Sequence, residues 1–457
     1  MLGHKRTYAK NLFLFIGDII FIILSAHLSI WLRLGWMPFS ILSEGVLFFL
    51  VVYLTMFYIF NLYSLNYKFR TTYYVSRFLS AVFGGTALVA VIFYLFPSWT
   101  IGGRSIFILN MGVVSIVVYG WRYLYHHFII SSLKVRSIVI VGAGATGKTI
   151  YKILSEKDEF IVKGFLDDNP ENIHEMIGTH SVIGDTSTLM NMTLNREIDT
   201  AVIAITRARN EQLFKTIVEC KMNGLEVYDM PSLYEELTGK LPVKHLNDIW
   251  MAFATFRGIG GSVYTDRLKR IVDIVLSIIG LILNIPIMLI VSVAIMLDSR
   301  GGILFRQTRV GKDGKNFQLI KLRSMIIDAE SDGAVWAKEN DKRVTQVGRY
   351  IRKLRIDEIP QMYNVLKGDM SFIGPRPERP EFIKKLIKEI PFYSIRHTVK
   401  PGLTGWAQVN FRYAASSIDA LEKLQYDLYY IKNLSIFLDF HILLKTVRVI
   451  LMVKGSR

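Results

Sequence analysis

The residues best suited to chemistry lie in a stretch rich in acids and bases, RYIRKLRIDEIPQMYNVLKGDMSFIGPRPERPEF, at 349–382. Asp357 and Glu358 come just before a proline, which suits the first turn of a helix. The positive helix end and the nearby Arg352 and Arg355 favour ionised carboxylates. An ionised aspartate beside arginines suits a nucleophile or a metal ligand. Adjacent helical side chains diverge by about 100°, so the two acids would have separate roles. Ordinary surface ion pairs are the alternative.

Two nearby segments could bind phosphate. Arg376 lies between Pro375 and a second proline, so its backbone is stiff and its guanidinium is held for bidentate phosphate binding. The segment KPGLTGWAQVN, at 400–410, has the Gly and Pro spacing of a shaped loop, with Gln408 and Asn410 available for polar contacts. A purely structural turn is the alternative for this segment.

A separate glycine-rich stretch, GAGATGKT at 142–149, matches two phosphate-binding patterns. Gly142, Gly144 and Gly147 fit the dinucleotide pattern, and a second predicted strand ends at Asp167, where a Rossmann unit holds a ribose. The same stretch also fits a P-loop, which needs a further acid at a strand end. The run DTAVIAIT ends in threonine instead, so the Rossmann-like reading is favoured.

We therefore predict a Rossmann-like, nucleotide-binding-type domain over residues 131–255. Whether it binds NAD or another nucleotide is left open, because the glycines could serve only to bring helix and strand close together. No acid or base that could act as a catalyst stands out around this loop.

The first quarter of the chain is strongly apolar. The chain is 51% hydrophobic with a mean hydropathy of +0.33, which favours membrane segments over a soluble protein. Four apolar stretches, about 11–34, 41–60, 76–96 and 105–125, each approach the ~20 residues that a spanning helix needs. We predict a four-helix transmembrane region over 1–130, and Lys and Arg flanking the spans place both its ends in the cytoplasm.

The remaining bulk properties limit the partners. A formal net charge of +17 fits anionic lipid headgroups and phosphorylated substrates. No nucleic-acid-binding signature stands out, so we expect no nucleic-acid partner. The single cysteine, Cys220, excludes an intramolecular disulfide and fits a reducing compartment. No cluster of Cys and His with metal-ligand spacing is visible.

A fifth apolar stretch, 271–297, is long enough to span but has basic residues on both sides, which violates the inside bias. Pro286 near its middle removes a backbone donor, and Asn284 is placed to compensate. We predict a re-entrant helix at about 268–298 that enters and leaves on the same face. The overall expectation is a membrane protein of the α plus α/β class.

Three motifs resemble the monotopic phosphoglycosyl transferases, the bacterial sugar transferase family. They are RQTRVGKDGKNFQLIKLRSM, LRIDEIPQMYNVLKGDMSFIGPRPERPEF and KPGLTGWAQVNFR. The layout resembles the large form, in which a four-helix membrane region and a Rossmann-like domain precede a catalytic domain, here 262–457. Such proteins are polyprenyl-phosphate hexose-1-phosphate transferases that begin exopolysaccharide, capsule or O-antigen synthesis.

The resemblance implies roles for individual residues. Asp357 would attack the β-phosphorus of a UDP-sugar and release UMP, Glu358 would help hold Mg²⁺, and undecaprenyl phosphate would then take the sugar phosphate. The positions it implies near the phosphates or nucleotide are Arg323, Arg352, Pro375, Arg376 and Arg412. Lys269, Arg270 and Pro286 match the re-entrant helix that seats the lipid. Two departures are Ile285-Pro286, where some members have Ser-Pro, and NFR at 410–412, where some have NGR.

The resemblance also implies a multi-pass protein of the bacterial inner membrane with its catalytic domain on the cytoplasmic face. We expect UDP-glucose as donor, with UDP-galactose or another UDP-hexose as the alternative. From other classes, a membrane-attached NAD-dependent oxidoreductase and a nucleotide-sensing scaffold stay open. A homodimer is also left open.

Overall fold

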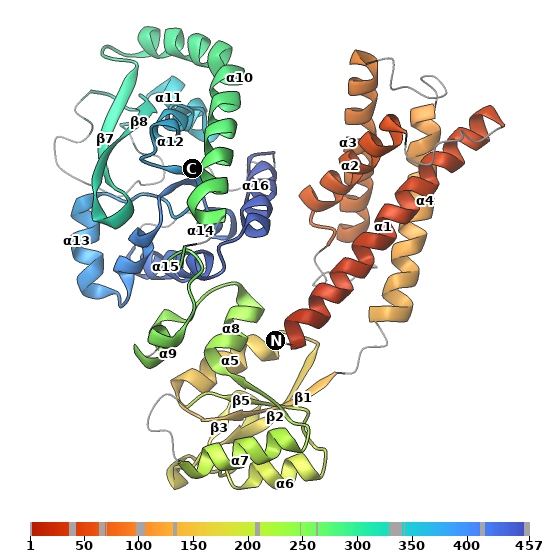
Figure 1. Cartoon of the computed structure of the whole chain (residues 1–457), viewed down its shortest axis with the longest axis vertical. Helices are drawn as coiled ribbons and strands as arrows, with labels where there is room; N and C mark the ends of the chain where they lie inside the picture. The colour runs from red at the N-terminus through yellow and green to blue at the C-terminus, as the bar shows by residue number, and fades with distance from the viewer. Residues whose placement is uncertain are drawn as a thin grey trace. The chain divides into compact units, whose positions relative to one another are not determined.

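The computed structural model describes residues 2–35, 43–63, 69, 71–96, 106–130, 135–205, 211–246, 248–261, 264–327, 329, 341, 343–411 and 416–451. The chain divides into two compact units, Met1–Lys134 and Val135–Arg457. Figure 1 labels their helices and strands.

The first unit is a bundle of α1 (Leu2–Leu34), α2 (Glu44–Ile59), α3 (Thr72–Leu95) and α4 (Ile106–Tyr125). Its core is apolar, yet large apolar side chains such as Ile108 and Ile116 are also 75% and 76% exposed. An apolar exterior of this kind suits lipid. Within the described part of this unit, three helical segments are long and apolar enough to cross a membrane, namely Leu12–Leu34, Thr72–Leu95 and Ile106–Ile129.

The second helix is shorter than the predicted stretch 41–60. Ser43 caps α2 by accepting a hydrogen bond from the amide of Val46, which starts the helix at Glu44. Its 16 residues span about 24 Å at ~1.5 Å per residue, less than the ~30 Å hydrocarbon thickness.

A buried ion pair joins the helices of this bundle. Arg122 Nε and Nη2 donate to the two carboxylate oxygens of Asp18 at 3.1 and 2.5 Å. Arg122 Nη1 also donates to the carbonyl of Leu62 and to the hydroxyl of Tyr74, both at 2.9 Å. Arg122 therefore connects α1, α3, α4 and the turn after α2.

The second unit begins with a six-stranded sheet in the order β3-β4-β2-β1-β5-β6. The strands are β1 (Arg136–Val141), β2 (Phe160–Leu166), β3 (Met176–Ile177), β4 (His180–Gly184), β5 (Thr200–Ile203) and β6 (Glu226–Asp229). All neighbouring pairs are parallel except β3 with β4. The last four residues of the central β1 are apolar and buried, and they contribute to the core on both faces of the sheet.

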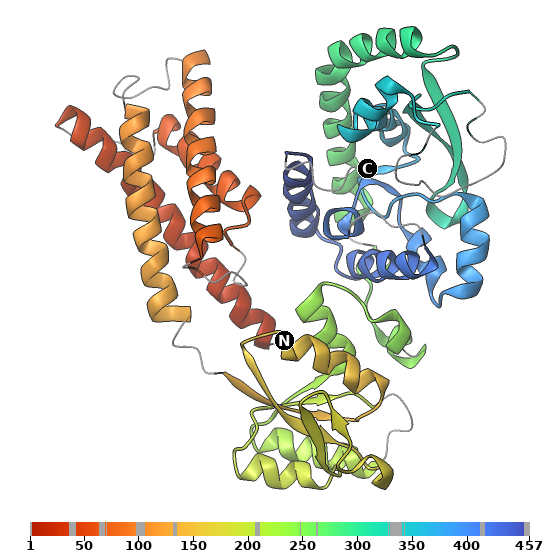
Figure 2. The ribbon, with the colours of Figure 1, turned by 180° about the vertical axis from the view of Figure 1, so that it is seen from behind.

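Helices cover both faces of this sheet (Figure 2). They are α5 (Ala145–Ser155), α6 (Thr188–Leu194), α7 (Glu211–Met222) and α8 (Met230–Thr238). One core cluster contains Ile150 and Leu233, from α5 and α8. The other contains Met192 and Leu213, from α6 and α7.

The C-terminal part of this unit, residues 241–451, has its own core. Its elements are α9 (Asp248–Phe253), α10 (Lys269–Asp298), β7 (Leu304–Val310), β8 (Asn316–Leu322), α11 (Gln346–Lys353), α12 (Gln361–Lys367), β9 (Ser371–Ile373), α13 (Pro380–Glu389), β10 (Gly402–Thr404), α14 (Trp406–Asn410), α15 (Ser417–Lys432) and α16 (Ile436–Leu451). β7 and β8 form an antiparallel hairpin, and β9 pairs with β10 in parallel.

The segment after α8 packs with this C-terminal core. Leu241 and Val243 belong to the same buried cluster as Trp406, and the Trp406 indole Nε1 donates to the carbonyl of Gly239 at 2.8 Å. The predicted boundary between 255 and 262 therefore falls inside one compact unit.

α10 is a long apolar helix that is largely exposed. Figure 1 shows it changing direction sharply along its length, and Pro286 lies inside it. The helix is long and apolar enough to cross a membrane, and only 6% of its most apolar stretch is buried. Asn284 Nδ2 donates to the carbonyl of Gly280 at 2.8 Å. Pro286 deprives residue 282 of its helical donor, so Asn284 does not replace that bond as predicted.

Lys269 and Arg270 hold the base of α10. Lys269 Nζ donates to Asp439 of α16 at 2.6 Å. Arg270 donates to the carbonyls of Val365 and Leu366 near the end of α12, both at 2.6 Å. A cation at a helix C-terminus also interacts favourably with the helix dipole. Both side chains thus anchor α10 to neighbouring helices.

Candidate active site

The two acids lie in a short 3-10 helix, Ile356–Glu358, between α11 and α12. This differs from the prediction of one helix, because α12 begins only after Pro360. Asp357 and Glu358 are 7% and 9% exposed. Such burial excludes the alternative that both acids form ordinary ion pairs at the surface.

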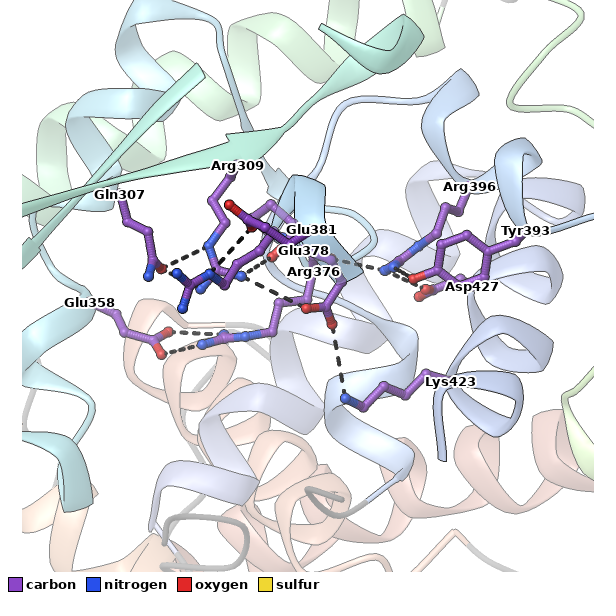
Figure 3. A network of polar contacts seen from close by, with 12 residues as sticks. Gln307, Arg309, Glu358, Arg376, Glu378, Glu381, Tyr393, Arg396, Lys423 and Asp427 are labelled. Atoms are coloured by element: carbon purple, nitrogen blue, oxygen red, sulfur yellow. Dashed lines mark hydrogen bonds and ion pairs between the residues drawn. The ribbon is translucent and has the colours of Figure 1, made fainter. Parts of the chain in front are cut away.

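Glu358 is held by two arginines. Arg376 Nη2 and Nη1 donate to Oε1 and Oε2 at 2.7 and 3.3 Å, as Figure 3 shows. Arg355 Nη1 also donates to Oε1 at 3.2 Å. Burial opposes ionisation of Glu358, but Arg376, Lys321 and Arg355 outweigh it and hold its pKa well below the usual range.

Asp357 has a different environment. Its buried Oδ1 has no hydrogen-bond partner among the described residues. Burial, and then the adjacent Glu358, raise the pKa of Asp357 to about 6 against the opposing charges of Lys321, Arg376 and Arg352. The arginines were predicted to favour ionisation of both acids. Their main effect is on Glu358, because Glu358 is the carboxylate that they pair with.

Lys321 is a residue of this site that the motif analysis missed. It lies on β8, where Phe317 and Leu319 are buried and alternate side chains share a face. The sequence signal was a lysine at the third position of that apolar face. Burial lowers the pKa of Lys321, and the charge of Glu358 opposes this effect.

The other arginines that the resemblance implied do not all lie beside the two acids. Arg352, half-buried on α11, is among the cations that act on Asp357. The Nη atoms of Arg323 donate to the carbonyls of Arg300 and Ser299 at 2.9 and 2.7 Å, and its role near the nucleotide stays a prediction. Arg323 caps the end of α10 because the last carbonyls of a helix lack backbone donors. Arg412 lies outside the described residues.

Arg376 projects from a loop that is held by its carbonyl groups. Pro375, which is buried, accepts a hydrogen bond from the amide of Gly402 at 2.9 Å. The segment that contains Gly402 is stabilised internally: Gln408 Nε2 donates to the carbonyl of Leu403, and Asn410 Nδ2 to the carbonyl of Trp406. These amides therefore shape the loop that supports Arg376.

The residues of the glycine loop make contacts with neighbouring backbone groups of the same domain. Gly142 has a φ of +112°, and a Cβ on Gly147 would lie 2.0 Å from the Gly142 carbonyl oxygen. Close packing thus accounts for Gly147. Asp167 accepts from the amides of Ala143 at 2.7 Å and Asn169 at 3.0 Å, so both its oxygens are used. Gly144 caps α5 without a side-chain bond.

Comparison with known proteins identifies the family of this chain. Residues 264–453 match the bacterial sugar transferase family, and 137–214 match the PglD N-terminal domain. A putative undecaprenyl-phosphate N-acetylgalactosaminyl 1-phosphate transferase from Bacillus subtilis (strain 168) is 54% identical over 28% of this chain and 72% of its own length. The chain belongs to the bacterial sugar transferase family.

Two longer relatives match more of the chain. UDP-N-acetylgalactosamine-undecaprenyl-phosphate N-acetylgalactosaminephosphotransferase from Aeromonas hydrophila is 44% identical over 53% of this chain and 56% of its own. UDP-glucose:undecaprenyl-phosphate glucose-1-phosphate transferase from Klebsiella pneumoniae is 36% identical over 63% and 61%. The chain thus spans less than two thirds of the length of these two relatives.

Proposed function

We propose that this protein transfers a hexose 1-phosphate from a UDP-sugar to undecaprenyl phosphate and releases UMP. The observation that carries the proposal is the division of roles within the buried pair of acids. Glu358 is neutralised by Arg376 and Arg355, whereas Asp357 keeps a carboxylate oxygen without a partner among the described residues.

The reaction has two displacement steps. An Asp357 oxygen attacks the β-phosphorus, the bond from that phosphorus to the UMP oxygen breaks, and UMP leaves with the bonding electrons. An oxygen of undecaprenyl phosphate then attacks the phosphorus of the aspartyl-phosphosugar and frees Asp357. Lys321, Arg352 and Arg376 offset the negative charge that gathers around Asp357.

The two acids also fit Mg²⁺ as a cofactor. Among the described residues no group of three or more His, Cys, Asp or Glu side chains could hold a metal ion. Mg²⁺ at nucleotide sites commonly takes one or two carboxylates together with phosphate oxygens and water, which this pair can complete. Glu358 would hold the ion in exchange for one arginine contact. Bound Mg²⁺ would reduce the charge of the substrate diphosphate.

We further propose that the site works at the cytoplasmic face of the inner membrane. α10 would enter and leave the same leaflet at Pro286, since its exposed face is apolar and its base is tied to α12 and α16. Phe437 and Phe440 of α16 are 83% and 60% exposed and would lie at the same interface. A cysteine introduced just after Leu297 should be labelled only by reagents that reach the cytoplasm. Labelling from the periplasm would contradict this topology.

The donor is proposed only as a UDP-hexose. Relatives that are named for N-acetylgalactosamine are 44% and 54% identical, and the glucose relative above is 36% identical. UDP-glucose and UDP-N-acetylgalactosamine are therefore the first two donors to compare.

We propose that the six-stranded sheet is a Rossmann-like scaffold. Asp167, which was predicted to bind a ribose, instead accepts hydrogen bonds from the amides of Ala143 and Asn169.

The test is release of UMP by the full-length membrane protein, given undecaprenyl phosphate, Mg²⁺ and a panel of UDP-sugars. Turnover with at least one donor should need Mg²⁺ and should fall by about a thousandfold or more in Asp357→Asn, which lacks the nucleophile. Wild-type turnover in that variant would rule out the covalent mechanism. A requirement for nicotinamide would favour the oxidoreductase alternative.

A further inference from the structure

The loop that carries Arg376 is held in an unusual way. Residues 374–379, between β9 and α13, contain two prolines that have no amide hydrogen to donate. The carbonyl groups of the four consecutive residues 375–378 instead each accept a hydrogen bond. Backbone amides of Gly402 and Val310 serve the first and last of these carbonyls.

Arginine side chains serve the two central carbonyls. Arg396 Nη2 donates to the Arg376 carbonyl at 2.8 Å, and Arg309 Nη1 donates to the Pro377 carbonyl at 3.1 Å. Arg376 is therefore fixed at both ends, by Arg396 at its backbone and by Glu358 at its guanidinium (Figure 3).

Arg396 is itself rigidly supported. Its side chain is 6% exposed, and Nη2 also pairs with Asp427 Oδ2 of α15 at 2.9 Å. Nη1 donates to the hydroxyl of Tyr393 at 2.6 Å. The flat guanidinium thus has its donors committed to three fixed acceptors, and little rotation is left to it.

Stability alone is a weak reason for this arrangement. Desolvating two charges costs several kcal/mol each, and well-packed apolar side chains can often replace such a pair without loss of stability. What an apolar replacement cannot supply is a donor to the Arg376 carbonyl. We propose that Arg396, held by Asp427, is a positioning residue that fixes Arg376 against Glu358.

The consequence for catalysis rests on the proposed function. Arg376 lies next to the carboxylate that attacks, and a displacement of about 1 Å at a catalytic group can cost about a hundredfold in rate. Loss of the Arg396 contact should therefore lower kcat much more than it raises KM. Because Arg396 contacts the backbone of Arg376, we expect it to act on the reaction through Arg376.

Hydrogen exchange of the full-length protein tests the positioning without any need for turnover. Arg396→Lys keeps the charge but loses the planar fork, and it should speed exchange of the amides in 371–382. Exchange in β1 should stay unchanged. Asp427→Asn provides a second variant, because it keeps Arg396 and removes only its anionic support. Unchanged exchange of 371–382 in both variants would overturn the proposal.

A double-substitution cycle on UMP release supplies the kinetic readout. Arg396→Lys and Arg376→Lys should each lower kcat by about tenfold to a hundredfold, and together by little more than the worse of the two. Lys432→Gln is the matched control, since its ion pair with Glu235 does not touch the loop. Its effect should simply add to that of Arg376→Lys. Full additivity of Arg396→Lys with Arg376→Lys would also overturn the positioning role. Absence of UMP release from the wild type would instead count against the proposed function and leave the exchange result intact.

Discussion

Arg376 grips Glu358 with both terminal nitrogens, at 2.7 and 3.3 Å, and leaves the adjacent Asp357 outside this pairing. Two neighbouring carboxyl groups thereby acquire opposite tendencies. The pKa of Glu358 falls well below its usual range, while that of Asp357 rises to about 6. Glu358 therefore stays ionised at neutral pH, whereas Asp357 changes its protonation state near pH 6.

The first prediction concerns the pH dependence of turnover. Only ionised Asp357 can attack phosphorus, so kcat/KM should rise about tenfold per pH unit below its pKa and level off above it. The break should lie near pH 6, where burial has placed the pKa of Asp357. Initial rates of UMP release from pH 5 to 8 would measure it. A flat profile over that range would mean that the nucleophile titrates near its ordinary value of 3.8.

The second prediction concerns stability. A carboxyl group whose pKa is higher in the folded than in the unfolded state destabilises the fold above the folded value, and the penalty vanishes below the unfolded value. The interval from 3.8 to about 6 corresponds to about 3 kcal/mol. Asp357→Asn should therefore raise the thermal midpoint at pH 8, and its advantage should shrink toward pH 4. A lower midpoint at pH 8 would contradict the raised pKa.

The third prediction concerns Lys321. Its charge stabilises ionised Asp357, so Lys321→Met should raise the pKa of Asp357 further and move the acidic limb of the rate profile to higher pH. Lys315→Met serves as the control, because Lys315 is exposed at the turn of the same hairpin. The control should keep the wild-type profile. An unshifted limb in Lys321→Met would remove the residue from the site.

The fourth prediction separates a structural arginine from those of the site. Arg323→Met would leave the carbonyls of Ser299 and Arg300 without their donor. It should cost about 1–3 kcal/mol of stability, while KM for the UDP-sugar stays within about twofold. Thermal unfolding and saturation kinetics on one preparation would decide the matter. A large rise in KM with an unchanged midpoint would support the nucleotide role that the resemblance implied for Arg323.

The sequence predicted features that follow directly from residue type, such as apolar length, a proline within a helix and a cluster of charges. The apolar length of 271–297 and the position of Pro286 predicted a re-entrant helix, and the structure has one long apolar helix there with Pro286 inside it. Asp357 and Glu358 stood out beside a run of arginines. Two positions in β8 and just after it were harder to interpret. Lys321 was not singled out from the sequence, although it shares a strand face with the buried Phe317 and Leu319. Arg323, two residues later, is turned toward the end of α10.

A sequence motif does not show which groups its polar side chains bind. The acid of the glycine loop motif, Asp167, accepts from loop amides, and Asn284 bonds to the carbonyl of Gly280. Asn284 reaches a carbonyl only four positions back in its own helix, so its partner follows from helical spacing. Asp167 and the Ala143 amide are 24 positions apart, and Arg396 and the Arg376 carbonyl are 20 positions apart. Only the folded chain brings these two pairs together.

The pairing of Asp18 with Arg122 bears on how the N-terminal bundle is assembled during synthesis. The two residues are 104 positions apart, so α1 emerges from the ribosome long before its counter-ion exists. An unpaired charge deep in hydrocarbon costs about 2.5–3.5 kcal/mol even by the lower estimates. α1 and α4 each carry one half of this ion pair, so each charge is offset only when the two helices pack together.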